Sequence, residues 1–182
     1  ASDGGPVVCS DRVESSVRGG YAMGVCSRGY AQLAQTASAM GEVGAETICG
    51  MWAHDVERSN ASCVCMEPEA ASGGLTEEQC RAKGIDCKVG KFPLVANGKS
   101  LIINGGDGLV KCIADAKYEE VLGMHIIGPR ATDLIAEGAL AIGEEMTLDE
   151  IIATIHSHPT VTETMREAAL QAEKRAIHTS NK

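Results

Sequence analysis

Two apolar runs of strand length, separated by six mostly polar residues, place the strongest constraint on how this chain can fold. The runs cover residues 108–114 and 121–127, and residues 115–120 lie between them. Two apolar segments joined in this way are typical of an antiparallel hairpin with a long turn. The sequence therefore predicts an antiparallel sheet.

Shorter segments before the hairpin add two strands and one helix. Residues 63–66 and 87–93 are further apolar runs of strand length. Between them, Thr76 and Gln79 have the spacing of a capping box, so we expect a helix that begins there and stops at Gly84.

Three helices are expected after the hairpin. The first begins near Pro129, Thr147 and Glu150 cap the second, and the third covers residues 161–169. The residues expected to face the core are Leu134, Ile135, Gly138 and Ile142 in the first helix, and Ile151, Ile152 and Ile155 in the second. Three helices at one end of an antiparallel sheet predict a layered α+β domain.

The first third of the chain differs in composition from the rest. Residues 1–60 are rich in Gly and Ser, with strand-length runs at 6–9 and 21–25 and helical spacing over 31–49. This change predicts a small N-terminal region followed by a domain over residues 61–182.

Charge and hydropathy exclude two classes of partner. The 182 residues contain 16 Lys and Arg against 25 Asp and Glu, a formal charge of −9, which argues against nucleic acid as a partner. No apolar run approaches the ~20 residues that a membrane-spanning helix needs. We therefore expect neither a nucleic-acid-binding nor a membrane protein.

Eight cysteines are spread at irregular spacings and form neither a disulfide framework nor a zinc pattern. We expect mostly reduced, buried thiols, with Cys63 and Cys65 packed in the core, and no metal site.

The tripeptide at residues 98–100, Gly-Lys-Ser, matches the last three residues of a phosphate-binding loop motif. Pro93 stands where that motif needs its first Gly, and no helix is expected to follow, so we interpret the match as accidental.

The segment at residues 156–163 supports two interpretations. In the structural one, Thr160 and Glu163 form a capping box, and His156 and His158 are solvated loop residues. In the functional one, the Glu163 carboxylate orients one nitrogen of His158 and leaves the other free as an acid or base. Spacing alone leaves both interpretations open.

The chain resembles the FAD-dependent pyridine nucleotide-disulfide oxidoreductases, and within them the dihydrolipoamide dehydrogenases. Over roughly 115 residues it is similar to their C-terminal dimerisation domain, and residues 7–50 resemble the last part of their FAD-binding domain, which would make residues 1–60 a remnant of it. The matching stretches of the dimerisation domain are residues 67–71, 75–79, 89–93, 108–111, 121–129 and 156–160, together with Glu163.

This resemblance implies half of an active site that is shared across a homodimer. His158 would be the acid–base group facing the partner's disulfide and flavin, Glu163 its orienting carboxylate, and Pro159 a neighbour of the partner's flavin. The implied activity is the oxidation of dihydrolipoamide with NAD. The implied partner is the dihydrolipoyl acyltransferase of 2-oxoacid dehydrogenase complexes, in the cytoplasm or the mitochondrial matrix.

The resemblance also implies FAD contacts in the N-terminal region. Residues 21–24, ending at Gly24, match the strand that leads to the family's ribityl-binding Asp, and Gln32, Leu33 and Ala34 match the helix start that meets the isoalloxazine ring. Val25 stands at the position of the Asp and cannot accept a hydrogen bond from the ribityl hydroxyls. Leaving a ligand hydroxyl without its acceptor typically costs ~1 to 3 kcal/mol of binding free energy.

The family's dinucleotide-binding Gly-x-Gly-x-x-Gly, its redox-active Cys-x-x-x-x-Cys and its NAD domain are absent from the 182 residues. We therefore expect this chain to be catalytically incomplete alone. The main alternative is a non-catalytic dimerisation module derived from the family. An unrelated His/Glu hydrolase is a remote one, because no nucleophilic Ser or Cys motif accompanies the two residues.

Overall fold

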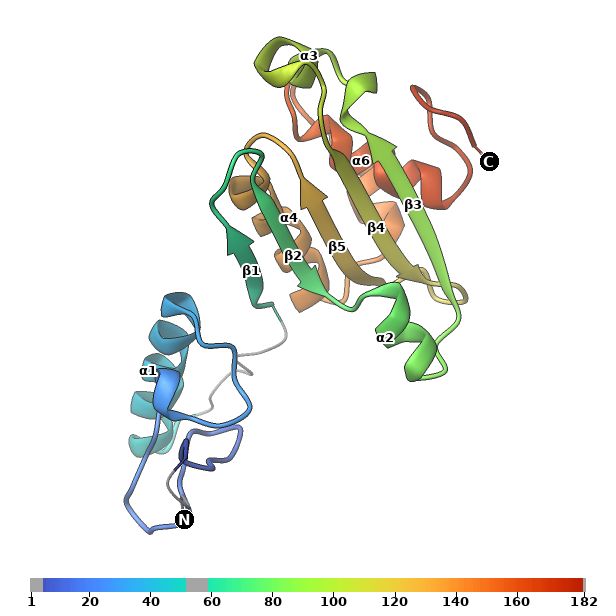
Figure 1. Ribbon diagram of the computed structural model, residues 1–182. Coiled ribbons are helices and arrows are strands. Elements are labelled where there is room, and N and C mark those ends of the chain that lie inside the picture. The colour runs from blue at the N-terminus through green and yellow to red at the C-terminus, as the bar shows by residue number, and fades with distance from the viewer. Residues whose placement is uncertain (1–4, 52–58, 182) are drawn as a thin grey trace. The chain divides into compact units, whose positions relative to one another are not determined.

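The protein was analysed as a computed structural model, which describes residues 5–51 and 59–181 (Figure 1). The chain divides into two compact units, residues 1–60 and 61–182, here called the N-terminal and C-terminal units. Among the described residues, no helix has the length and apolar character needed to cross a membrane.

The C-terminal unit is built on a five-stranded sheet in which every neighbouring pair is antiparallel (Figure 1). The order is β1-β2-β5-β4-β3, and the strands are β1 (Ala61–Val64), β2 (Ala70–Gly74), β3 (Cys87–Pro93), β4 (Leu109–Asp115) and β5 (Val121–Ile127). The predicted hairpin is the pair of β4 and β5, which confirms the α+β class. The sequence did not predict β2, and β1 begins two residues earlier than expected.

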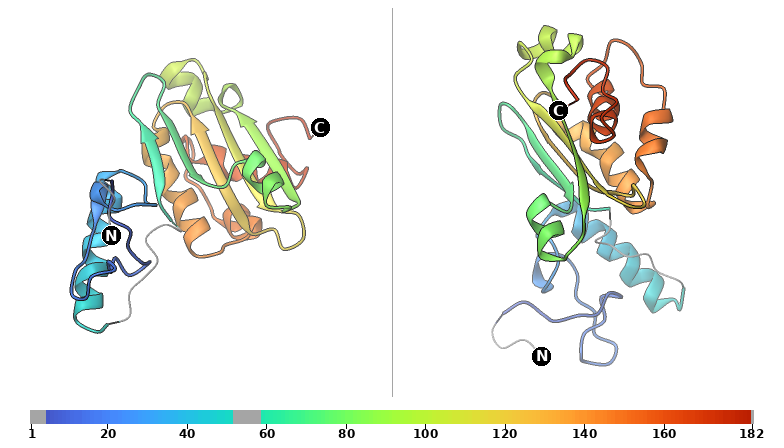
Figure 2. Two further views of the ribbon diagram at one scale, coloured as in Figure 1. Left: turned by 60° about the horizontal axis from the view of Figure 1, so that its bottom comes forward. Right: turned by 90° about the vertical axis from the view of Figure 1, so that its right-hand side faces the viewer.

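Three helices lie on the same side of this sheet, the first and last in contact with its strands and the middle one packed against the last (Figure 2). They are α4 (Ala131–Gly143), α5 (Leu148–Ala153) and α6 (Glu163–Ala172). Between helices and sheet lies one core, in which Phe92, Val110, Met124 and Met165 are almost completely buried. Gly90 on β3 allows the closest approach, because a Cβ atom there would collide with the backbone of α6 at Ala168.

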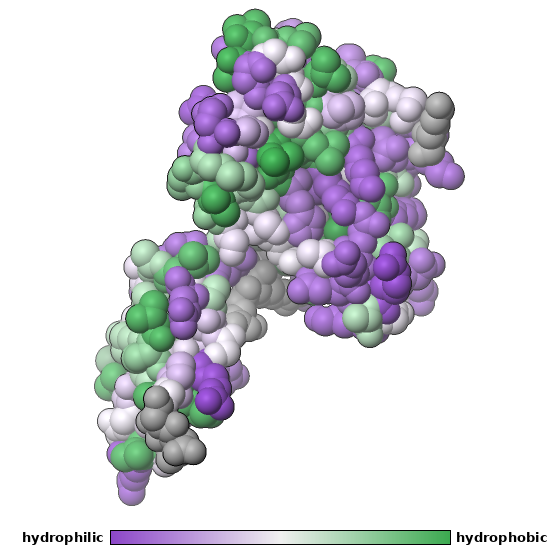
Figure 3. Space-filling model, viewed as in Figure 1, coloured by the Kyte–Doolittle hydropathy of each residue, from purple (hydrophilic) through white to green (hydrophobic). Residues whose placement is uncertain are grey.

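Two short helices flank the sheet. Helix α2 (Glu77–Ala82) begins at Thr76, and both hydrogen bonds of the predicted capping box are present. Helix α3 (Gly98–Asn104) follows Asn97, whose side chain accepts a hydrogen bond from the Ser100 N–H. This helix corrects the expectation that none follows the Gly-Lys-Ser tripeptide, because Asn97 supplies an N-cap. Its Leu101, Ile102 and Ile103 are exposed. Hydrophobic surface gathers over α3, at the top of Figure 3.

Two other expectations about burial were wrong. Ile155 is 96% exposed, because α5 ends at Ala153 and the backbone of Thr154 is extended. Only Cys80 and Cys112 of the eight thiols are buried. Cys65 lies beyond the end of β1 and is exposed, whereas Cys63 packs against the core.

The N-terminal unit contains a long helix, α1 (Ala34–Ile48), and Gly50, with a φ of 70°, follows its end as the sequence predicts. Its small core is formed by Val13, Met40 and Val43. The two predicted strands of this unit do not form, since its described residues pair only through isolated bridges such as Val7 with Ser27.

Candidate functional site

The loop between α5 and α6 carries both histidines of the candidate site. It begins at Thr154, where α5 ends, and three hydrogen bonds fix its path. Thr160 Oγ1 donates to the carbonyl of Ser157 at 2.6 Å, Asn97 Nδ2 donates to the carbonyl of Thr160 at 3.0 Å, and the Thr160 N–H donates to Glu163 at 2.9 Å. The loop is therefore tied to the start of α3 and to the first turn of α6.

The capping box expected from Thr160 and Glu163 is only half formed: the Thr160 N–H reaches the Glu163 carboxylate, but α6 begins at Glu163 itself and its N-cap, Thr162, makes no side-chain cap. Glu163 also contacts His158. Its Oε1 lies 2.9 Å from His158 Nδ1, and its Oε2 accepts the Thr160 N–H. Burial opposes ionisation of Glu163, but the Thr160 N–H and the His158 imidazole hold the pKa of its carboxyl below the usual value. The carboxylate therefore stabilises the turn and orients His158 at the same time.

His158 projects its free nitrogen into solvent. Its side chain is 81% exposed, and no described residue hydrogen-bonds to Nε2. When Nδ1 donates its proton to Glu163, Nε2 carries the lone pair. This arrangement fits a group that accepts a proton from a bound molecule and returns it.

His156 lies in a different environment, which the sequence did not predict. Its side chain is only 5% exposed, so it is not a solvated loop residue. Nε2 lies 2.8 Å from Glu137 Oε1 on α4, and Nδ1 lies 3.1 Å from the carbonyl oxygen of Thr154. The hydrogen bond to Glu137 raises the pKa of His156. No local spacing signals this contact, because 19 residues separate the two side chains.

A hollow of about 360 Å³ is lined by both histidines, Glu163 and the start of α3. Sequence analysis missed three of its polar lining residues, Arg166, Glu167 and His178. Glu167 is buried, and its carboxylate accepts the backbone N–H groups of Ile177 and His178 at 3.1 Å each. The C-terminal segment is thereby held beside the hollow.

Pro159 and Thr160 line a second hollow, of about 330 Å³, on the α4 side of the loop. Glu137, the partner of His156, lines it as well. The first hollow is therefore lined by a mixture of polar and apolar groups, whereas the surface of the second is mostly apolar. Within the described parts of the chain, no three His, Cys, Asp or Glu side chains gather in a way that could hold a metal ion.

The flavin residues implied by the resemblance belong to the N-terminal unit. Gly24 and Val25 form a 3-10 turn instead of ending a strand, and the Val25 side chain is 63% exposed and apolar. Gln32 and Leu33 precede the helix, and Ala34 is the first residue of α1, whose N-terminus has no side-chain cap. Val25 offers no acceptor to a ribityl hydroxyl. These residues therefore do not complete a flavin site.

Comparison with known proteins identifies the class of protein to which the chain belongs. Residues 60–169 match the family model described as pyridine nucleotide-disulphide oxidoreductase, dimerisation domain. The antiparallel sheet and the matched residues together define the C-terminal unit as a dimerisation domain of redox enzymes. The chain belongs to the pyridine nucleotide-disulphide oxidoreductase family.

The curated relatives to which the chain is similar include dihydrolipoyl dehydrogenases. The chain is 43% identical over 159 residues to a dihydrolipoyl dehydrogenase of Bacillus subtilis, covering 87% of this chain and 33% of the relative. It is 38% identical over 174 residues to the mitochondrial dihydrolipoyl dehydrogenase 1 of Arabidopsis thaliana, covering 96% and 34%. The chain thus spans about a third of the length of these relatives.

Solved structures share the fold. LpdA from Mycobacterium tuberculosis superimposes with a TM-score of 0.85 at 24% identity, covering 90% of this chain and 36% of that one. The flavoprotein disulfide reductase RclA from Escherichia coli gives a TM-score of 0.82 at 21% identity, covering 92% and 39%.

Proposed function

We propose that this chain supplies the acid–base half of a dihydrolipoyl dehydrogenase active site. The observation that carries the proposal is the 2.9 Å contact between His158 Nδ1 and Glu163, with the opposite edge of the imidazole open to solvent. The curated relatives named dihydrolipoyl dehydrogenase support the substrate class, a dithiol that must lose protons as it is oxidised to a disulfide.

In this proposal His158 Nε2 accepts the proton of a dithiol sulfur and later releases it. Glu163 accepts a hydrogen bond from the Nδ1–H group, which fixes the tautomer that presents a lone pair at Nε2. Asn97 and Thr160 hold the loop so that the imidazole edge stays at the mouth of the hollow. FAD and NAD would take up the electrons; because the residues described here do not complete a site for either, we assign no step to them.

A second subunit is part of this proposal. The family is defined by a dimerisation domain, and a general base that is 81% exposed has no reaction partner within the described residues. We propose that the dithiol and the redox groups approach His158 from a second subunit, in a homodimer with residues 1–60 as part of a FAD-binding domain. Association with a dihydrolipoyl acyltransferase, in the cytoplasm or the mitochondrial matrix, belongs to the same proposal.

One observation favours a second candidate function, a non-catalytic dimerisation module. Val25 presents an apolar side chain where the resemblance places the ribityl acceptor. A chain that had lost flavin binding would retain the fold and the dimer contact without turnover. This candidate predicts a dimer that shows no flavin absorbance and no activity, whatever other protein chain it is mixed with.

A chimera separates the two functions. The matched segment of the Bacillus subtilis relative is replaced by this chain, and dihydrolipoamide-dependent reduction of NAD is measured. We expect turnover in the chimera and a loss on the order of 10²- to 10⁴-fold in kcat for His158→Gln. The matched control is His125→Gln, which changes a histidine on β5 that does not line the hollow and leaves kcat near that of the chimera. A dimeric, inactive chimera would favour the module, and full turnover in His158→Gln would overturn the assignment.

A further inference from the structure

We propose that His156 is a positioning residue, a charged clamp that fastens the loop bearing His158 to helix α4. The catalytic consequence rests on the proposed function of His158, but the clamp itself does not. Nothing in the sequence distinguishes His156 from a solvated histidine, whereas the structure surrounds it with acceptors.

The contacts of the imidazole define its protonation. Nε2 faces the Glu137 carboxylate at 2.8 Å and Nδ1 faces the Thr154 carbonyl at 3.1 Å. A carbonyl oxygen can only accept a hydrogen bond, and an ionised carboxylate can only accept one as well. Both contacts are satisfied together only when both ring nitrogens carry protons, so His156 is an imidazolium in this geometry.

Burial makes the pair of charges effective. The His156 side chain is 5% exposed and that of Glu137 is 30% exposed, so water competes little with the contact on the histidine side. Arg166 on α6 is the opposing charge, and it is held in place by a 2.8 Å hydrogen bond from its Nε to the carbonyl of Ile152. The favourable influence of Glu137 on the imidazolium exceeds the penalties of burial and of Arg166.

The position of His156 in the loop determines which part of the loop the clamp holds. The Thr160 end of the loop is tied to α3 and α6 through Asn97 and Glu163. The end next to α5 is tied to α4 through His156, two residues before His158. Removing the clamp leaves the His158–Glu163 contact intact but frees the segment before His158, so the imidazole edge is less well placed.

The first test uses the 182-residue chain and does not require activity. The imidazole Cε1–H signals are followed by NMR as the pH is raised, in the wild type, in Glu137→Gln and, for assignment, in His156→Gln. We expect the His156 signal to titrate above the ordinary midpoint of about 6.5, and Glu137→Gln to lower that midpoint. A midpoint that is unchanged in Glu137→Gln would overturn the clamp.

The second test measures positioning in the active chimera. We expect His156→Leu to lower kcat on the order of 10- to 100-fold with little change in KM, and the pH profile to keep the shape set by His158. His156→Gln, which retains one N–H donor toward Glu137, should restore part of kcat. Wild-type kcat in His156→Leu would overturn the positioning role. An inactive parent chimera would contradict the proposed function, while the NMR result would still decide the clamp.

Discussion

Asn97 Nδ2 donates a 3.0 Å hydrogen bond to the carbonyl oxygen of Thr160, joining the start of α3 to the loop that bears His158. The same side chain accepts hydrogen bonds at 2.8 Å from the backbone N–H and from the hydroxyl of Ser100. Asn97 and Ser100 are both buried, so water cannot replace these partners. One amide side chain therefore stabilises a helix and the candidate site together.

Replacing Asn97 tests this double role. Asn97→Ala removes the helix cap and leaves the Thr160 carbonyl without its donor, so we expect a loss of about 2 kcal/mol in the free energy of unfolding. Asn97→Asp is the matched comparison, because it keeps the cap acceptor but replaces the donor with a carboxylate oxygen that faces the Thr160 carbonyl. Urea unfolding should rank the wild type above Asn97→Asp and Asn97→Ala. Equal stability of all three proteins would show that neither bond contributes.

The contact between β3 and α6 gives a second prediction, at Gly90. A Cβ atom at this position would collide with the backbone of Ala168 and Ala172, which cannot move without displacing the helix. We expect Gly90→Ala to lower the free energy of unfolding by about 1 to 3 kcal/mol. Gly98→Ala is the control, since nothing lies within 4 Å of its Cβ position and the residue is helical. Similar unfolding midpoints for the two variants would contradict close packing at Gly90.

The sequence predicted those parts of the fold that local patterns encode. Apolar runs of strand length located β3, β4 and β5, and Thr76 with Gln79 located α2, because these signals act over a few residues. Strand β2 escaped prediction because Ala70–Gly74 consists of small residues without an apolar pattern. Such a strand is held by its neighbours β1 and β5 on both sides, which is a tertiary effect.

The candidate site shows the same division between local and distant signals. The contact between His158 and Glu163 spans five residues, so spacing could suggest it. The contacts of His156 with Glu137 and of Asn97 with Thr160 join separate elements, and only the fold brings them together. Ile155 was misplaced because helical periodicity continues through it, whereas the chain leaves the helix after Ala153.

Thiol reactivity gives a third prediction, centred on Cys112 in β4. Complete burial raises the pKa of Cys112 to about 12, so almost no thiolate forms near neutral pH. We expect iodoacetamide at about pH 8 to alkylate the exposed Cys26, Cys49 and Cys65 and to leave Cys112 unmodified, as read by peptide mass spectrometry. Urea should make Cys112 reactive. Alkylation of Cys112 at the rate of Cys65 in the native protein would contradict its burial.

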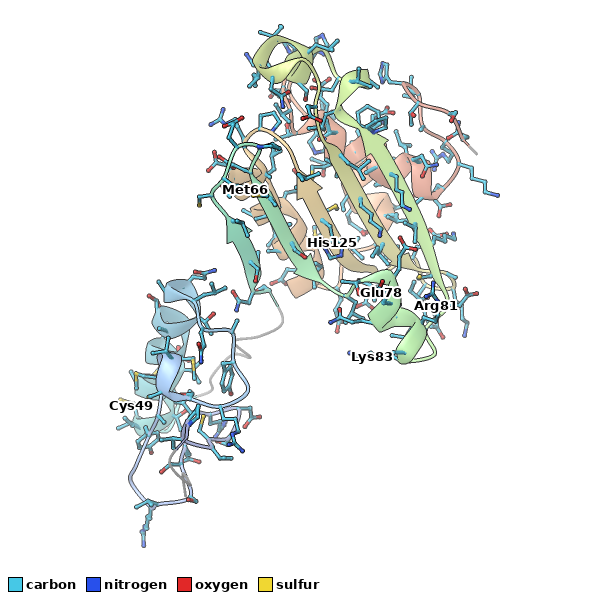
Figure 4. The ribbon with its side chains drawn as sticks, viewed as in Figure 1. Cys49, Met66, Glu78, Arg81, Lys83 and His125 are labelled. Carbon is cyan, nitrogen blue, oxygen red and sulfur yellow. The ribbon has the colours of Figure 1, made fainter. Side chains whose placement is uncertain are left out.

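The last prediction concerns His125, which lies in the middle of β5 (Figure 4). Its Nδ1 lies 2.6 Å from Ser72 Oγ, and its Nε2 lies 3.0 Å from the Leu75 carbonyl oxygen. Burial, assisted by the nearby Lys111 charge, lowers the pKa of His125 even though the Leu75 carbonyl favours the protonated ring. The folded protein therefore binds fewer protons at this ring than the unfolded chain does.

The sign of the pH dependence follows from this difference. A histidine whose pKa is lowered in the folded protein contributes stability that is fully present above its unfolded pKa of about 6.5. This stability is lost as the pH falls toward its pKa in the folded protein. Between about pH 7.5 and about pH 5.5, the wild type should lose more unfolding free energy than His125→Gln does. Gly98→Ala, which changes no titratable group, should keep the wild-type slope. If His125→Gln also kept that slope, the prediction would be contradicted. His156 cannot produce the expected loss, because its raised pKa contributes a pH dependence of the opposite sign.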